Sequence, residues 1–169
     1  MAHTPFADRV ALVTGGGSGI GAAISRELAK KGAKVVVSDL NHKNAEKVVQ
    51  EITDAGGTAV AFIADASSRE DNENLVKFAV DTYGKLNYAV NNAGIGGPPA
   101  PAGETDLDAW DKVIDLNLNG VLYGMRYQIP AMLEAGAEQS AIVNMASVTA
   151  WSPPRTTPRT RPSSTPWSA

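Results

Sequence analysis

Short apolar runs alternate along most of the chain with stretches in which apolar residues recur every three or four positions. The runs are rich in valine, isoleucine and alanine and are apolar throughout, which is typical of strands buried on both faces of a parallel sheet. We predict five such strands, over residues 9–13, 34–38, 58–64, 86–90 and 141–145.

The segments between these strands have a helical period. Two apolar stripes carry it, one formed by Ala45, Val48, Val49 and Ile52 and the other by Val76, Ala79, Val80 and Tyr83. A capping box at Ser67 and Glu70 is expected to open the second helix, and Gly84 to close it. With right-handed crossovers, this alternation predicts an α/β fold, a doubly wound parallel sheet of the Rossmann type that binds ligands at the carboxyl ends of its strands.

The composition fits one globular domain, because 43% of the 169 residues are hydrophobic and 20% are charged. A net charge of −3 leaves no basic footprint for nucleic acid. No signal peptide or membrane span is visible, so we expect no membrane association and a cytoplasmic location. The absence of cysteine excludes disulfides and thiolate catalysis, and neither His3 nor His42 suggests a metal site.

Residues 14–21 read TGGGSGIG and lie between the first predicted strand and a helical pattern that begins at Ala22. A strand that turns through glycine into a helix lets the backbone approach a pyrophosphate and directs helix N-terminal N–H groups at its charge. Glycine spacing alone is weak support, because any tight turn favours glycine. The candidate cofactor-binding residues of this loop are Thr14, Gly15, Gly17, Ser18, Gly19, Ile20 and Gly21.

Polar residues follow each predicted strand, at positions that a parallel sheet brings to one rim: Thr14, Asp39, Asp65, Asn91 with Asn92, and Ser147. Asp39, followed by Leu40, comes 18 residues after Gly21. A carboxylate there can accept hydrogen bonds from both ribose hydroxyls of an adenosine and would repel a 2′-phosphate, which favours NAD over NADP. A role for Asp39 as a helix cap is the alternative.

Five motifs in this order resemble the short-chain dehydrogenases/reductases: TGGGSGIG, Asp39, Asp65, NNAG at 91–94 and IVNMAS ending at Ser147. The resemblance covers about residues 9–149. It implies that Asp65 and Ala66 contact the adenine, and that Asn91, Ala93 and Gly94 line the cofactor and steady the central strand. It also implies a small alcohol or carbonyl substrate hydrogen-bonded by Ser147, and a tetramer or dimer built on a long helix at 106–134.

Asn117 is the second catalytic candidate. Trp110, Val113, Ile114 and Val121 define a stripe that we expect to be buried, and Asn117 falls on the same stripe. A buried amide needs hydrogen-bond partners, which neighbouring backbone could supply. By the resemblance, however, this position corresponds to the family's asparagine that orders a water in the proton relay, so we class Asn117 with Ser147.

The resemblance ends at the family's YxxxK pattern, whose tyrosine acts as acid or base toward the substrate. After Ser147 the chain contains no tyrosine or lysine, and Thr160 stands where the tyrosine is expected. A threonine hydroxyl has too high a pKa for this proton transfer. The sequence therefore predicts either a NAD-dependent dehydrogenase that lacks this segment or a noncatalytic remnant that binds a dinucleotide.

Residues 151–169 differ from the predicted cofactor-binding domain at 1–150. Thirteen of the last eighteen residues are Pro, Ser or Thr, and no Val, Ile, Leu, Phe or Met occurs among them, so we expect a solvated tail and a sheet that is incomplete at its C-terminal side. A one-base frameshift near codon 150 would explain this tail. The shifted frame can be written with tyrosine at Thr160 and lysine at Ser164, and the DNA over codons 147 to 152 tests the hypothesis.

Overall fold

The computed structural model describes residues 4–147, and the expected tail lies outside them. Strands and helices alternate as predicted. The order is β1 (Val10–Thr14), α1 (Gly19–Lys30), β2 (Lys34–Asp39), α2 (His42–Asp54), β3 (Thr58–Ile63), α3 (Arg69–Tyr83), β4 (Tyr88–Asn91), α4 (Leu107–Ile114), the π-helical turn η2 (Asp115–Asn119), α5 (Gly120–Ala135) and β5 (Ala141–Asn144). Short 3-10 turns, η1 (Ala102–Glu104) and η3 (Ala137–Gln139), precede α4 and β5.

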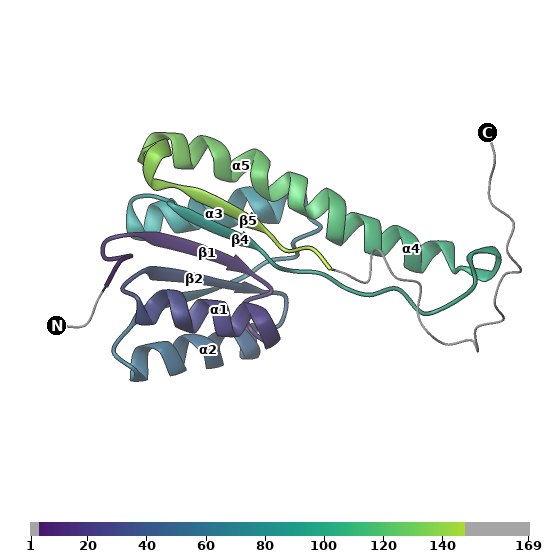
Figure 1. Cartoon of the computed structure of the whole chain (residues 1–169), viewed down its shortest axis with the longest axis horizontal. Helices are drawn as coiled ribbons and strands as arrows, with labels where there is room; N and C mark the ends of the chain where they lie inside the picture. Colours follow the sequence, from purple (N-terminus) through teal and green to yellow (C-terminus); the bar gives the residue numbers. More distant parts are fainter. Residues whose placement is uncertain (1–3, 148–169) are drawn as a thin grey trace, which may run out of the picture.

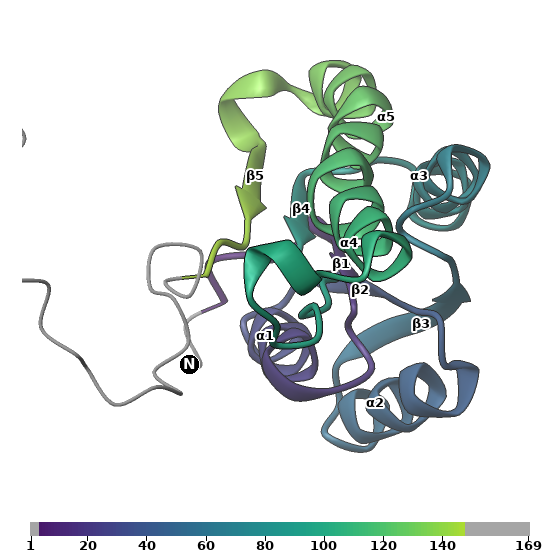
Figure 2. The ribbon, with the colours of Figure 1, turned by 90° about the vertical axis from the view of Figure 1, so that its right-hand side faces the viewer.

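The five described strands form one parallel sheet in the order β3-β2-β1-β4-β5, which confirms the doubly wound fold. Helices α1 and α2 cover one face, and α3 and α5 cover the other (Figures 1 and 2). The strand order reverses between β1 and β4, so the carboxyl ends of these two central strands open a crevice for a ligand.

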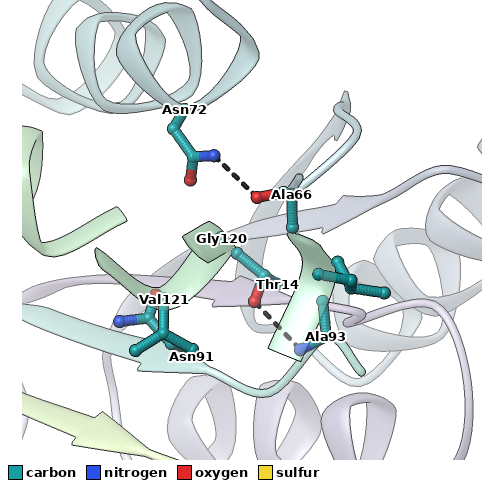
Figure 3. Close-up of a pocket in the computed structure, with 8 residues that line it drawn as sticks. Thr14, Ala66, Asn72, Asn91, Ala93, Gly120 and Val121 are labelled. Carbon is teal, nitrogen blue, oxygen red and sulfur yellow. Dashed lines mark hydrogen bonds between the residues drawn. The ribbon is translucent and has the colours of Figure 1, made fainter. Parts of the chain in front are cut away.

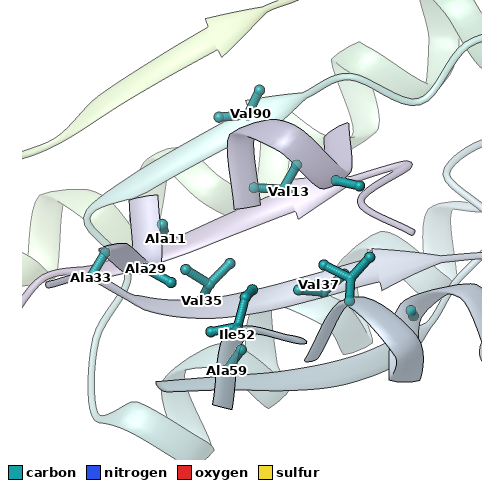
Figure 4. Close-up of a cluster of buried hydrophobic side chains, with 12 residues drawn as sticks. Ala11, Val13, Ala29, Ala33, Val35, Val37, Ile52, Ala59 and Val90 are labelled. Atoms are coloured by element: carbon teal, nitrogen blue, oxygen red, sulfur yellow. The ribbon is translucent and has the colours of Figure 1, made fainter. Parts of the chain in front are cut away.

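The core lies on both faces of the central strands. From Val10 to Val13, β1 is entirely buried, as the continuous apolar run predicts. On the α1 and α2 side, Val13, Val35 and Ile52 belong to one buried cluster (Figure 4). A second cluster under α3 and α5 includes Leu12 and Leu75. Full burial of each such side chain contributes roughly 1.5–3 kcal/mol, so the sheet provides a rigid base for its rim.

The prediction that every strand is buried on both faces is wrong for the two edge strands of the described sheet: in β3 only Ala59 is buried and Ile63 is 50% exposed, and β5 is exposed still further along its length. Val143 is 50% exposed, and Ala141 and Asn144 are exposed as well. The cause is position, because β5 is an edge strand of the described sheet and no element within residues 4–147 pairs with its outer side.

The predicted capping box of α3 is displaced by one residue. Ser68, not Ser67, is the N-cap, and its hydroxyl accepts a hydrogen bond from the Asp71 N–H at 3.2 Å. Ser67 is drawn into a turn instead, where its own N–H and hydroxyl donate to Asp65. The predicted C-terminus is confirmed, since Gly84 has a left-handed φ of +82°.

The helix expected over residues 106–134 is divided into α4, η2 and α5. The apolar stripe on it is not buried as predicted, because Trp110 is 53% exposed and Asn117 is also exposed. Figure 1 shows the reason: α4 extends beyond the ends of the strands, where the sheet cannot cover it. Within the described part of the chain, no helix has both the length and the apolar character needed to cross a membrane.

Candidate functional site

The loop between β1 and α1 depends on glycine for two different reasons. Gly15 and Gly19 have left-handed φ angles of +60° and +50°. A Cβ at Gly21 would lie 2.1 Å from the carbonyl oxygen of Gly15, so the helix backbone packs directly on the loop. A Cβ at Gly19 would meet nothing within 4 Å, which leaves open space beside the backbone at the first residue of α1.

The start of α1 has no side-chain cap. The side chains of Asn41, Ser68 and Asp106 accept hydrogen bonds from the first turns of α2, α3 and α4, whereas Ser18 makes no such bond for α1. The first turn of α1 also lacks an acidic residue. These N–H groups and the positive end of the helix dipole suit an anion such as a pyrophosphate.

A cleft of about 430 Å³ opens at this point, above the carboxyl ends of β1 to β4. It contains most of the predicted cofactor residues. These are Thr14, Gly15, Ser18, Gly19, Ile20, Asp39, Leu40, Asp65, Ala66, Ala93 and Gly94. Ser38, Ala64, Asn92, Ile95 and Leu116 complete the lining, and the described lining includes no lysine or arginine. The polar residues expected at the strand ends therefore line one cleft, which contains two carboxylates and the uncapped start of α1.

Three predicted cofactor residues lie behind this lining. Gly17 and Gly21 form the packed underside of the loop. Asn91 is buried and exchanges hydrogen bonds with Gln128 of α5 at 3.2 and 2.8 Å, and it donates to Asn144 of β5 at 2.8 Å. Asn91 thus joins three elements around the central strand.

Asn92 lies on the rim predicted from the sequence but is not among the predicted cofactor residues, and the structure gives it a role there. Its side chain donates to the carbonyl oxygens of Thr14 and Gly15 at 3.0 and 3.2 Å. The Thr14 hydroxyl oxygen accepts in return from the N–H groups of Asn92 and Ala93, the second of which is drawn in Figure 3. The second asparagine of NNAG was the available signal, and it holds β4 against the glycine loop.

The two carboxylates of the cleft are fixed by local backbone. Asp39 accepts from the N–H groups of Gly17 at 2.9 Å and Asn41 at 2.8 Å. Since Asn41 is the N-cap of α2, the alternative that Asp39 caps this helix is wrong. Asp65 accepts through one oxygen from both the N–H and the hydroxyl of Ser67. A carboxylate has about four acceptor sites, so both retain capacity for ligand hydroxyl or amino groups.

Comparison with known proteins gives the chain its family. Residues 9–158 match the short chain dehydrogenase family. The chain belongs to this family. Cyclohexanol dehydrogenase of Acinetobacter sp. (strain SE19) is 49% identical over 143 residues, which are 85% of this chain and 56% of that protein. 3beta-hydroxysteroid dehydrogenase 2 of Eggerthella lenta is 37% identical, over 86% of this chain and 56% of that protein.

Solved structures agree with this assignment. Levodione reductase superimposes with a TM-score of 0.80 at 34% identity, over 85% of this chain and 55% of that one. A metagenomic short-chain oxidoreductase in complex with NADP gives 0.79 at 33% identity, over 85% and 64%. This short-chain dehydrogenase sequence thus spans little more than half the length of the curated relatives it matches.

The structure places the two catalytic candidates of this short-chain dehydrogenase chain near the rim and outside the cleft lining. The Asn117 side chain accepts from the N–H of Ile95 at 2.9 Å and donates to its carbonyl oxygen at 2.8 Å. The amide is therefore satisfied by neighbouring backbone, and it fixes a cleft residue. Ser147 is exposed and follows the carboxyl end of β5. Position Thr160 lies outside the described residues.

Proposed function

We propose that this chain forms the cofactor-binding part of a NAD-dependent oxidoreductase, which transfers a hydride between the nicotinamide and an alcohol or carbonyl substrate. The uncapped start of α1 beside the cleft is the observation that carries this proposal. Ser18, Gly19 and Ile20 would hold the pyrophosphate, and the bound nicotinamide would supply the hydride chemistry. Asp65 and Ala66 would contact the adenine.

The preference for NAD rests on charge. Asp39 would accept the ribose hydroxyls, and the described lining of the cleft offers no cation to a 2′-phosphate. Two like charges about 4 Å apart repel by roughly 4 kcal/mol near a protein surface. Lys43 does not line the cleft, but it lines an adjoining shallow surface that shares Asp39 and Leu40 with it. One related structure holds NADP, so the two cofactors must be compared directly.

For the substrate we propose a secondary alcohol on a carbon ring, or the corresponding ketone. The relatives support this class by their names: cyclohexanol dehydrogenase, 3beta-hydroxysteroid dehydrogenase 2 and cis-4-hydroxycyclohexanecarboxylate dehydrogenase, the last 41% identical and from Sinomonas cyclohexanicum. Ser147 would hydrogen-bond the reacting oxygen, and Asn117 would support the proton relay through its hold on Ile95.

The alternative function is a noncatalytic protein that only binds the dinucleotide. It is favoured by the sequence after Ser147, which contains no tyrosine or lysine for the proton transfer. For a polypeptide of this sequence we expect cofactor binding without turnover. Oxidation of cyclohexanol by the purified chain would overturn that expectation, and the DNA over codons 147 to 152 would show whether a frameshift accounts for the missing pattern.

The deciding experiment is a fluorescence titration of the purified chain with NADH and NADPH. We expect NADH to bind at least about tenfold more tightly, from the repulsion at Asp39. Failure to bind either cofactor would contradict the proposal, and equal binding of both would contradict the NAD preference. Intact mass, against the 17.6 kDa of this sequence, establishes which polypeptide is being titrated.

We further propose a cytoplasmic dimer or tetramer that associates through α4 and α5. Large apolar side chains are exposed along these helices and the turn between them: Leu107, Trp110, Leu118, Leu122, Ile129 and Leu133. An accumulation of exposed large apolar side chains on neighbouring elements is typical of interaction sites. Light scattering of the purified chain tests the assembly, and Leu122→Lys should shift it toward monomer.

A further inference from the structure

Asp39 contacts two different parts of the cofactor site. One carboxylate oxygen accepts the Gly17 N–H of the glycine loop at 2.9 Å, and the other accepts the Asn41 N–H at the start of α2 at 2.8 Å. The same side chain lines the cleft, where the ribose is expected. It therefore lies between the ribose position and the loop that is expected to hold the pyrophosphate.

The packing around this contact leaves little freedom. A Cβ added at Gly17 would lie 2.9 Å from both Cγ and Oδ2 of Asp39, and 2.9 Å from the Cβ of Asn44. The loop thus rests against the carboxylate and against the first turn of α2. The next anchor is one residue earlier, where the Gly16 N–H donates to the Ser38 carbonyl at 2.8 Å. Side chains hold the loop at two points: Asp39 at the Gly17 N–H, and Asn92 at the Gly15 carbonyl oxygen, 3.2 Å away.

We propose that Asp39 is a positioning residue for the pyrophosphate loop as well as the residue that selects the ribose, an inference that rests on the proposed cofactor function. Loss of the carboxylate removes the acceptor of the Gly17 N–H and loosens the loop at that residue, while the bonds at Gly15 and Gly16 remain. The affinity for the phosphate groups then falls together with the affinity for the ribose. A substitution at Asp39 intended to admit NADP consequently weakens the binding of both dinucleotides.

The test separates the two roles with a probe that has no ribose. Inorganic pyrophosphate and NADH are titrated into the wild type, Asp39→Ala, Asp39→Asn and Asp65→Ala, and amide hydrogen exchange of Gly17 is measured without ligand. Asp65→Ala is the matched control, because Asp65 lies in the same cleft but is bonded to Ser67 and not to the loop. Asp39→Asn retains one side-chain carbonyl oxygen that can accept from the Gly17 N–H. It keeps the test informative if Asp39→Ala fails to fold.

In Asp39→Ala we expect roughly tenfold faster exchange at Gly17 and about threefold weaker binding of pyrophosphate, from the loss of one hydrogen bond. Asp39→Asn should recover part of the protection, and Asp65→Ala should weaken only NADH. The inference is overturned if Gly17 stays protected and pyrophosphate binds Asp39→Ala as it binds the wild type. Failure of the wild type to bind NADH would instead count against the proposed function, because exchange at Gly17 needs no ligand.

Discussion

Asn92 and Thr14 hold each other through both side chain and backbone. The Asn92 amide donates to the Thr14 carbonyl oxygen at 3.0 Å, and the Thr14 hydroxyl oxygen accepts the Asn92 N–H at 3.0 Å. The residues are 78 positions apart and lie at the ends of the two central strands. This pair therefore links β1 to β4 at the base of the crevice, where the strand order reverses.

Removing either side of this pair should destabilise the fold. Asn92→Ala deletes two donors, and Thr14→Val leaves the N–H groups of Asn92 and Ala93 without their acceptor. We expect each variant to lose about 1–3 kcal/mol in the free energy of unfolding, measured by urea denaturation. Thr14→Ser retains the hydroxyl and serves as control. Wild-type stability in Thr14→Val would show that these bonds are dispensable.

Alanine substitutions should have graded effects among the glycines. Gly21→Ala should prevent folding, since its Cβ would lie 2.1 Å from the Gly15 carbonyl oxygen. Gly19→Ala has room for the methyl group but keeps a φ of +50°, so it should cost about 1–2 kcal/mol. Gly103→Ala, in open space and without a positive φ, should change stability by less than about 0.5 kcal/mol. Thermal melts of the three variants check this order, and equal effects at 19 and 21 would contradict it.

Tyr83 should make stability sensitive to alkaline pH. Burial raises the pKa of Tyr83 above its usual 10.0, and its hydroxyl has no hydrogen-bond partner among the described residues. In the unfolded chain Tyr83 ionises near pH 10, whereas in the folded protein it stays protonated to higher pH. The contribution of the protonated Tyr83 to the free energy of unfolding is therefore complete below about pH 10 and declines above it.

Tyr83→Phe should therefore match or exceed the wild type near pH 8, by up to about 1 kcal/mol, because a buried hydroxyl without a partner is removed. Above about pH 10 it should lose less stability than the wild type. Urea denaturation of both proteins at the two pH values gives the comparison. The same alkaline loss in both would rule out Tyr83 as its source.

Asn117→Ala should loosen the loop after β4. It removes both hydrogen bonds to Ile95, so we expect roughly tenfold faster amide exchange at Ile95 and about threefold weaker NADH binding. Asn119→Ala is the control, because Asn119 lies on the same π-helical turn and its side chain donates to the Asp115 side chain and, within residues 4–147, not to Ile95. Unchanged exchange at Ile95 in Asn117→Ala would contradict this role.

The neighbouring asparagines at the end of β4, Asn91 in the strand and Asn92 directly after it, show what periodicity could not assign. Successive residues of a strand point to opposite sides, and here Asn91 faces Gln128 while Asn92 faces the glycine loop. The sequence places both residues at the rim but gives only Asn91 as a site candidate, and the motif does not show which side each one faces. The register between β4 and β1, in which Val13 pairs with Val90, decided which side each asparagine faces.

The sequence by itself determined the alternation of strands and helices, the parallel sheet and the rim of polar residues. Apolar runs of strand length specify buried strands, and the carboxyl ends of parallel strands must converge. Only the tertiary structure decided the exposure of Trp110, the shift of the α3 cap to Ser68 and the uncapped start of α1. Each of these depends on which groups meet in the folded chain. A helical stripe is buried only where the sheet covers it. A serine before a helix caps it only when the local turn directs its hydroxyl at the N–H groups of the first helical turn.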